Sequence, residues 1–229
     1  MRKLLAKGVF ISLLLTGFSG AGQGVAEARL PSHFDIHITP TALAHPDPSV
    51  RIGAEFMTKN RWSYGISGGA AAFRQMRNDK RTNYIFYEVR PEIKFYWFQG
   101  NDIGWKLPQD MGCYFAMEGI YANSRYTIEN SSFYADFEQI TSFEKADFRK
   151  SKFGGVAKSG VKFLIGRKLS VDFYSGIGFA RTDVAYSDVV NPQNKSEDTG
   201  FKAEDFYDGK KTIPQFVLGL KVGIRLWEE

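Results

Sequence analysis

The stretch YIFYEVRPEIKFYW, residues 84–97, alternates between charged and apolar side chains almost without a break. The charged residues take every second position: Glu88, Arg90, Glu92 and Lys94. Side chains of a β-strand point alternately to its two faces, so this pattern predicts one long strand between two very different environments. The fold depends on which of these faces points outward.

The composition of the whole chain agrees with a β-rich fold. The chain has 229 residues, of which 15% are aromatic and 23 are glycine. Phe and Tyr favour strands and Gly weakens helices, so we predict a single all-β domain. The single cysteine, Cys113, belongs to no disulfide within the chain and no zinc motif, and we interpret it as an apolar packing residue.

The first 28 residues have the pattern of a cleavable secretory signal peptide. Three basic residues within the first seven positions precede the apolar run 9–15, and Ala-Glu-Ala at 26–28 offers a cleavage site. We therefore expect residues 1–28 to be removed and residues 29–229 to form the mature domain. Removal lowers the formal charge of +5 by two, and so mild a charge argues against a nucleic-acid partner.

The alternation of residues 84–97 recurs along the mature chain and predicts eight strands: 34–42, 51–56, 62–72, 84–97, 111–129, 158–165, 169–180 and 214–226. Many of them reach about 9 to 15 residues, longer than the usual 5 to 6, and this length suits tilted strands that cross a bilayer. No later run of about 18 apolar residues predicts a membrane-spanning helix.

The connections between these strands alternate in length. Tight turns follow the second and sixth strands, and longer connections follow the third, fifth and seventh. Short periplasmic turns and long extracellular loops are typical of outer-membrane barrels. We therefore expect 130–152 and 187–211 to be extracellular loops that are available to a partner.

The two faces of the predicted strands differ in the size of their residues. The polar faces carry Gly, Ala and Ser among the charges, whereas the apolar faces carry unbroken large residues. A narrow interior needs small residues beside long ones, and a lipid-facing band tolerates no charge, since Arg or Lys at the midplane costs roughly 2 to 4 kcal/mol. We therefore predict charges inside and apolar residues against lipid. A soluble barrel of the lipocalin kind, with the opposite orientation, is the alternative.

The predicted interior set contains nearly equal numbers of acids and bases: Arg51, Glu55, Glu88, Arg90, Glu92, Lys94, Glu118, Lys158, Lys162, Asp172, Lys221 and Arg225. Eight strands leave an interior that side chains fill, so we expect these charges to pair in a network that plugs the barrel. The alternative is a narrow channel for small solutes. A girdle of aromatic residues at the membrane interface is predicted near the strand ends: Trp62, Tyr87, Trp97 and Trp227.

No group of residues in the sequence predicts catalysis. The histidines, His33, His37 and His45, lie near the first strand and match no metalloprotease or His–Ser motif. We interpret His37 as an interior residue and predict no enzymatic activity, no cofactor and no metal. A lipid-modifying enzyme, which would need a His or Ser on the lipid-facing surface, is the less favoured alternative.

Three blocks of sequence resemble small outer-membrane barrels of the OmpA/OmpX type: VRPEIKFYW at 89–97, VDFYSGIGFA at 171–180 and FVLGLKVGIRL at 216–226. The chain more closely resembles an uncharacterised family of Bacteroidetes, described only as a domain of unknown function that forms an outer-membrane β-barrel. The resemblance implies an eight-stranded antiparallel up-and-down transmembrane β-barrel in the outer membrane of a Gram-negative bacterium. It supplies no catalytic residues. We expect a monomer with a structural or surface-interaction role.

Pro91 stands in the middle of the predicted strand 84–97. A closed barrel has no free edge, and proline lacks the N–H that would complete the ladder. We therefore expect a bulge or a local break in pairing at Pro91.

Overall fold

The computed structural model describes residues 32–44, 48–71, 81–99, 111–136, 139–166, 168–196 and 207–228. The predicted signal peptide and His45 lie outside these ranges. Within them, no helix combines the length and the apolar character needed to cross a membrane.

The described residues form strands and one short 3-10 helix: β1 (His33–Ile38), η1 (Pro40–Ala44), β2 (Ser49–Met57), β3 (Trp62–Ala71), β4 (Arg81–Gln99), β5 (Met111–Asp136), β6 (Gln139–Ile165), β7 (Leu169–Val190), β8 (Gln193–Ser196) and β9 (Gly209–Glu228).

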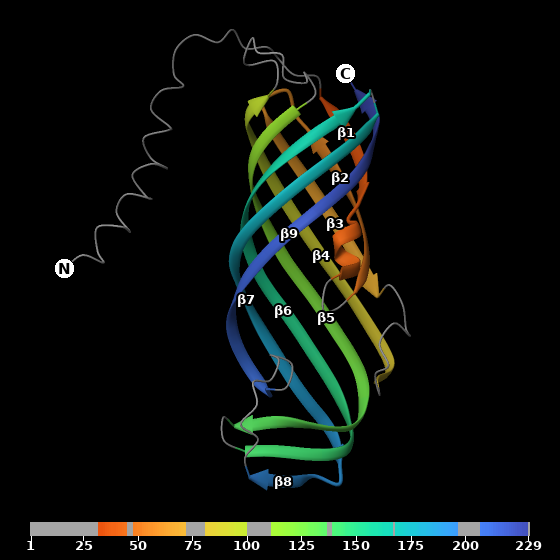
Figure 1. Ribbon diagram of the computed structural model, residues 1–229, viewed down its shortest axis with the longest axis vertical. Coiled ribbons are helices and arrows are strands. Elements are labelled where there is room, and N and C mark those ends of the chain that lie inside the picture. Colours follow the sequence, from red (N-terminus) through yellow and green to blue (C-terminus); the bar gives the residue numbers. More distant parts are fainter. Residues whose placement is uncertain are drawn as a thin grey trace, which may run out of the picture.

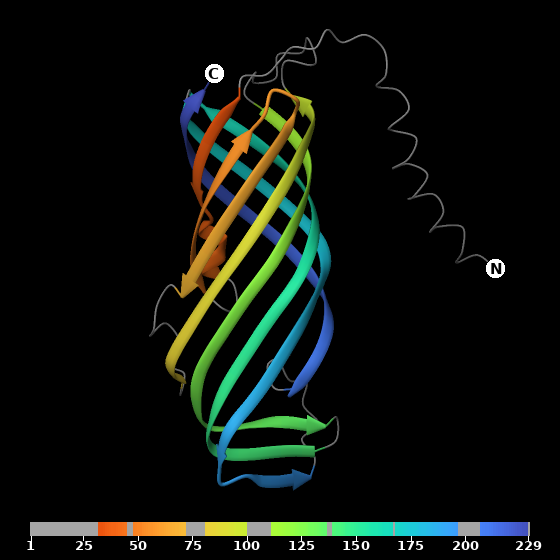
Figure 2. The same ribbon diagram turned by 180° about the vertical axis from the view of Figure 1, so that it is seen from behind.

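Eight of these strands close a ring, and all pairs in the ring are antiparallel. Its order is β1-β2-β3-β4-β5-β6-β7-β9, and β9 pairs back onto β1. The short strand β8 stays outside the ring and pairs only with the start of β6. Successive strands run up and down the ring, as Figures 1 and 2 show. The prediction of eight antiparallel up-and-down strands is therefore confirmed.

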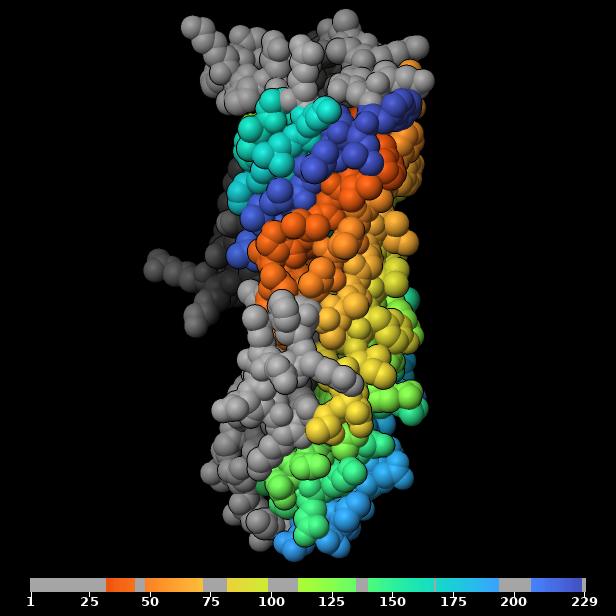
Figure 3. All heavy atoms as spheres, turned by 90° about the vertical axis from the view of Figure 1, so that its right-hand side faces the viewer, coloured from red at the N-terminus to blue at the C-terminus, as the bar shows by residue number. Residues whose placement is uncertain are grey.

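The two ends of the ring differ. At one end, which we call the terminal end, β1 begins and β9 ends, with His33 paired to Glu228. The short connections from β2 to β3 and from β6 to β7 also lie at this end, which is at the top of Figure 1. At the opposite end, which we call the far end, β5 and β6 meet and β8 pairs with β6. Figure 3 shows the described strands winding obliquely around an elongated body.

Charged side chains point into the ring and apolar side chains point out of it. On β4, Glu88 and Lys94 are 3% and 1% exposed, whereas Tyr87, the residue next to Glu88, is 44% exposed. On β9, Phe216 and Leu218 are 80% and 84% exposed. This orientation is opposite to that of a protein whose apolar core is inside. On each strand of the ring, the residues predicted to point inward do so, and those predicted to point outward do so. This includes β5, whose alternation is the least regular in the sequence.

The first strand is shorter than predicted. It ends at Ile38 rather than at residue 42, because Pro40 has no N–H to donate and begins the helix η1. Thr39 N–H still donates to the Arg51 carbonyl at 3.0 Å. Beyond it, the Thr41 hydroxyl accepts a hydrogen bond from Leu220 N–H at 3.2 Å, so η1 supplies the partner that β1 no longer offers to β9.

The prediction of loops at 130–152 and 187–211 is wrong for most of the described residues in these ranges. β5 and β6 continue as a paired hairpin to Asp136 and from Gln139, and β7 continues to Val190. Asn130 and Asp188 have φ of 48° and 52°, a left-handed conformation that Asn and Asp tolerate better than most residues. Asn130 lies within β5, and the part of the β5–β6 hairpin at the far end runs crosswise to the rest of these strands (Figure 1).

Pro91 interrupts the pairing on one side only. Toward β3 the register is continuous, with Ile66 opposite Pro91. Toward β5 the pairing stops after Val89 and resumes at Glu92 with no register shift, so a local break is confirmed and a bulge is not. Gly119 accommodates the proline ring, because a Cβ added to Gly119 would lie 3.1 Å from Pro91 Cγ.

Candidate functional site

All eight strands of the ring contribute inward-facing residues to one interior site. The twelve predicted interior residues all lie at inward positions, and each is buried except Arg225, which is partly exposed. These side chains meet because the ring is narrow enough for residues on non-adjacent strands to touch. The ion pairs follow one another from the terminal end toward the far end.

Nearest the terminal end, Asp35 lies close to two cationic side chains and to a histidine. Lys162 Nζ lies 2.7 Å and Arg225 Nε 3.5 Å from its carboxylate, and His33 Nε2 lies 3.7 Å away. Lys162 Nζ is also 3.1 Å from Glu55 Oε1. Lys162 therefore links this group to the next carboxylate.

At the middle of the interior, Lys94 joins two carboxylates. Its Nζ lies 2.8 Å from Glu55 Oε2 and 2.8 Å from Asp172 Oδ2. Each carboxylate also accepts a tyrosine hydroxyl, from Tyr96 at 3.0 Å and from Tyr114 at 2.7 Å. A buried ion pair is stable only when such additional hydrogen bonds offset the desolvation of its charges.

A second set of pairs extends the network toward the far end. Glu92 contacts Lys158, and Lys221 Nζ lies 2.5 Å from Glu92 Oε2. Lys158 Nζ is 2.7 Å from Glu118, and Arg90 Nη1 is 3.0 Å from the other oxygen of Glu118. Glu92 and Glu118 are register partners on β4 and β5, and Lys158 bridges the two carboxylates.

Glu88 ends the network on the side of the far end. Arg51 Nη2 and Arg90 Nε lie 2.7 and 2.8 Å from its two oxygens, and Ser49 Oγ donates to it at 2.9 Å. Lys94 Nζ also lies 3.6 Å from Glu92 Oε2, so the ion pairs form one continuous chain from Arg225 to Arg51. Because Arg51 and Glu88 come from different strands, this last pair also ties β2 to β4.

Tyrosine rings fill the space between the charges. Lys94 Nζ lies 4.5 Å from the centroid of Tyr114, and Lys158 Nζ lies 4.5 Å from the centroid of Tyr174. A Cβ added to Gly160 or Gly219 would collide with these two rings. The sequence pattern of small residues beside long ones on the inward face thus has a direct structural reason.

Beyond Glu88 the interior becomes aromatic. We call this region the aromatic cap, formed by Tyr126, Phe133, Phe143, Phe148 and Tyr186. The rings of Tyr126 and Phe148 stack with centroids 4.3 Å apart, and those of Phe133 and Tyr186 with centroids 4.4 Å apart. The bent hairpin of β5 and β6 carries much of this cap, so it closes the interior at the far end.

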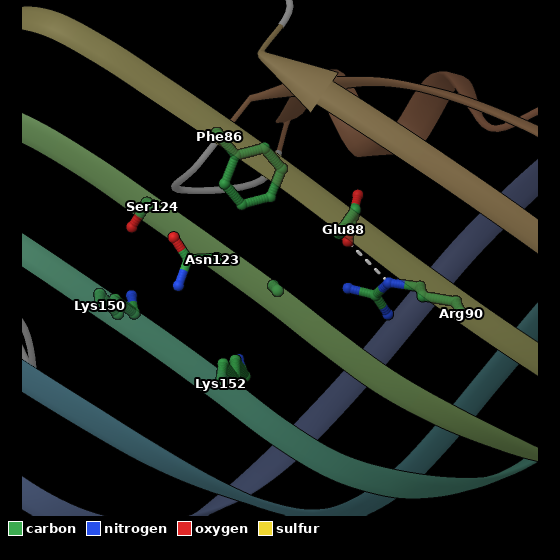
Figure 4. A pocket seen from close by; sticks show the side chains of 8 residues that line it. Phe86, Glu88, Arg90, Asn123, Ser124, Lys150 and Lys152 are labelled. Carbon is green, nitrogen blue, oxygen red and sulfur yellow. Dashed lines mark hydrogen bonds and ion pairs between the residues drawn. The ribbon is translucent and has the colours of Figure 1, made fainter.

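A small pocket lies between the charged network and the aromatic cap. It is lined by Phe86, Glu88, Arg90, Ala122, Asn123, Ser124, Lys150 and Lys152 (Figure 4). Its volume of about 20 Å³ suffices for roughly one water molecule. A solute larger than water would therefore have to displace side chains to occupy this pocket.

The predicted aromatic girdle divides between two levels. Trp62, Trp97 and Trp227 all face outward near the terminal end, where Trp97 stacks on Phe115. Tyr87 stands ten positions from Trp97 along β4, and its ring centroid lies 6.2 Å from that of Tyr121. The four residues therefore mark two separate belts rather than one.

The histidines do not form a site of their own. His33 and His37 both face the interior and are buried. Within the described ranges, no three His, Cys, Asp or Glu side chains gather in an arrangement that could hold a metal ion. Cys113 is a free thiol of intermediate exposure on the outward face of β5, so it lies apart from the interior charges.

Sequence reasoning missed several residues that complete the network: Asp35, Ser49, Ser63, Tyr96 and Tyr114. Tyr96 continues the alternation of β4 two positions after Lys94, and Asp35 alternates with Phe34 in the same way. The sequence therefore identifies both as inward positions. It does not predict that they act as hydrogen-bond or ion-pair partners, because that depends on which strands face each other across the ring.

No curated protein and no solved structure matches this chain. One family model does match, over residues 35–207, which is most of the chain and includes the strands that supply nearly all of the interior network. The protein thus belongs to the family described as "Protein of unknown function (DUF3575)".

Proposed function

We propose that this protein is an outer-membrane β-barrel of a Gram-negative bacterium, with a structural or surface-interaction role. Its ring strands would cross the bilayer, and the charged network would fill the lumen. The observation that carries this proposal is the orientation of the side chains, with charges paired inside and large apolar residues exposed outside. The signal-peptide pattern of residues 1–28 supports the same location.

The exposed apolar surface is too extensive for a monomer in water. Large side chains on every strand of the ring are exposed, and the outward residues Ile177 and Phe216 pair directly across β7 and β9. Monomeric soluble proteins rarely expose a continuous apolar patch of more than a few hundred Å². Lipid tails would cover this surface around the whole ring.

The spacing of the two aromatic belts fits a bilayer. Trp97 and Tyr87 are ten residues apart on β4. At about 3.3 Å per residue and a strand tilt of about 35–45°, ten residues span roughly 25 Å along the barrel axis, which is the height of the apolar band in outer-membrane barrels. The belts would then lie at the two membrane interfaces.

The filled interior favours a structural or interaction role over solute transport. Lys94, Glu92 and Lys158 lie across the middle of the ring, each within an ion pair, and the aromatic cap covers the far end. An open channel would require these groups to separate. The hairpin of β5 and β6, with β8 beside it, projects beyond the Tyr87 belt and is the part available to an extracellular partner.

Gel mobility tests the membrane proposal. A folded outer-membrane barrel in detergent should migrate at a different position when it is left unheated than when it is boiled, and the protein should leave the membrane only with detergent. Extraction without detergent, together with a mobility that does not depend on heating, would contradict the proposal.

Single-channel recording separates the plugged barrel from the narrow channel. In planar bilayers we expect no steady conductance. A steady conductance that is abolished by changing Lys94 or Lys221 would favour the channel instead.

A further inference from the structure

We propose that Arg125, Arg149 and Arg181 form a binding site for the phosphate group of an anionic lipid. This inference rests on the proposed membrane location. It adds the class of ligand and the end of the ring at which that ligand binds. The three residues lie on β5, β6 and β7, and all three are exposed on the outward face.

Two of these arginines oppose each other directly. Arg125 and Arg149 are register partners in the β5–β6 ladder. Side chains in such positions have Cβ atoms about 4.5–5.5 Å apart, and like charges directly opposite each other are destabilising. In the described part of the chain, neither guanidinium has a carboxylate partner. A phosphate bound between them would accept hydrogen bonds from both and remove the repulsion.

Two acidic side chains that stand close to the arginine pair in register, Asp147 and Asp183, make contacts with other residues. Asp183, which pairs in register with Ser151, contacts Lys210 Nζ at 3.6 Å. Asp147 Oδ1 accepts a hydrogen bond from Thr127 Oγ1 at 2.7 Å. Among the described residues, neither carboxylate forms an ion pair with Arg125 or Arg149.

Exposed aromatic rings border the arginines on the side of the membrane band. Arg181 is the register partner of Phe153 and lies two positions from Phe179 on the same face of β7. Phe153 and Phe179 are 71% and 67% exposed, and Tyr121 pairs with Phe153 on the next strand. The Arg125–Arg149 pair thus has apolar rings on its membrane side, and Arg181 stands level with those rings. That arrangement fits a phosphate joined to acyl chains better than it fits free phosphate.

The terminal end supplies matched control residues. Lys59 and Lys168 are exposed there, in the two tight turns, on the opposite side of the apolar band. Changing both removes the same charge as changing Arg125 and Arg149. The comparison therefore separates a local site from an effect of total charge.

The test uses native mass spectrometry of the full-length mature protein in maltoside micelles. The probes are phosphatidic acid and the diacylglycerol with the same acyl chains, which differ only in the phosphate. We expect the wild type to bind phosphatidic acid in preference to diacylglycerol. R125Q/R149Q should weaken the binding of phosphatidic acid about tenfold, the scale expected from losing charge-assisted hydrogen bonds to phosphate, and K59Q/K168Q should retain it.

Two results would overturn the inference: equal binding of both lipids, or equal weakening by both double variants. Competition with inorganic phosphate tests whether the site binds the phosphate group of a lipid or free phosphate. Displacement of the lipid by millimolar inorganic phosphate would show a site for free phosphate and would contradict the lipid assignment. Retention of the lipid supports it.

Folding is checked by the heat-dependent gel shift in the same micelles. If R125Q/R149Q lacks that shift, the single variant R181Q replaces it. R181Q should weaken the binding of phosphatidic acid about threefold. Unchanged binding in R181Q would contradict the site. A wild-type protein that shows no heat-dependent shift would contradict the proposed membrane function itself. That outcome is distinct from a folded protein that binds both lipids equally.

Discussion

Lys94 Nζ lies 2.8 Å from Asp172 Oδ2, although the two residues stand on β4 and β7 and are 78 positions apart in the sequence. These strands are not neighbours in the ring, so the ion pair crosses its interior. The same ammonium group also holds Glu55 on β2. Lys94 therefore ties together three strands, and the closed ring depends on a charge where a soluble protein would place an apolar core.

Removing the Lys94 charge should be strongly destabilising. K94M leaves Glu55 and Asp172 buried with no ammonium between them, and breaking a buried pair in this way costs about 3–5 kcal/mol. The measurement is urea unfolding in micelles, followed by gel mobility. K210M is the control, because the pair of Lys210 with Asp183 is exposed and such pairs contribute about 0–1 kcal/mol. Equal losses in both variants would show that the interior network does not stabilise the ring.

A charge on the apolar face should impair insertion. L218K places an ammonium on the outward face of β9, at a site that is 84% exposed, and near the bilayer midplane this costs about 2–4 kcal/mol. S187K adds the same charge at an exposed position of β7, closer to the far end and opposite Asp147. The fraction of protein that inserts into lipid vesicles from urea should fall for L218K and stay near wild type for S187K. Insertion of both variants at the wild-type level would mean that Leu218 does not face lipid.

The contact between Gly119 and Pro91 predicts a coupled pair of substitutions. G119V forces a branched side chain against the proline ring, and overpacking of this kind costs about 1–3 kcal/mol. P91A should relieve the clash and also restore a backbone donor facing β5. Urea unfolding of G119V, P91A and the double variant forms a mutant cycle, in which the double variant should be more stable than G119V alone. Additive effects would contradict the contact.

The bend at Asn130 should tolerate glycine but not valine. The φ of 48° is accessible to glycine, whereas a β-branched residue in this left-handed conformation costs about 1–2 kcal/mol. Limited proteolysis should cut the hairpin of N130V faster than that of wild type, while N130G resists. Equal cleavage rates in N130V and N130G would show that the left-handed conformation does not hold the hairpin in place.

Local alternation made the inward and outward faces predictable from sequence. The period of two on β4 and β9 assigns each side chain to a face without reference to any other strand, which is why the interior residues could be named in advance. The pairing of Lys94 with Asp172 could not be predicted from the sequence, because it depends on the stagger of strands that are distant in the sequence. The length of β5 and β6 was also hidden. The bend at Asn130 shifts the alternation before Phe133 and Phe143, so the hairpin resembles a loop in sequence.

The central claim is that the outward face of the ring lies against lipid. Spin labels introduced one at a time at Phe216, Leu218 and Lys210, in a C113S background, measure it directly in bilayers by their collisions with oxygen and with a water-soluble nickel complex. The labels at 216 and 218 should collide with oxygen and scarcely with nickel, whereas the label at 210 should show the reverse. Collisions with nickel at 216 and 218 as frequent as at 210 would contradict the membrane-spanning ring.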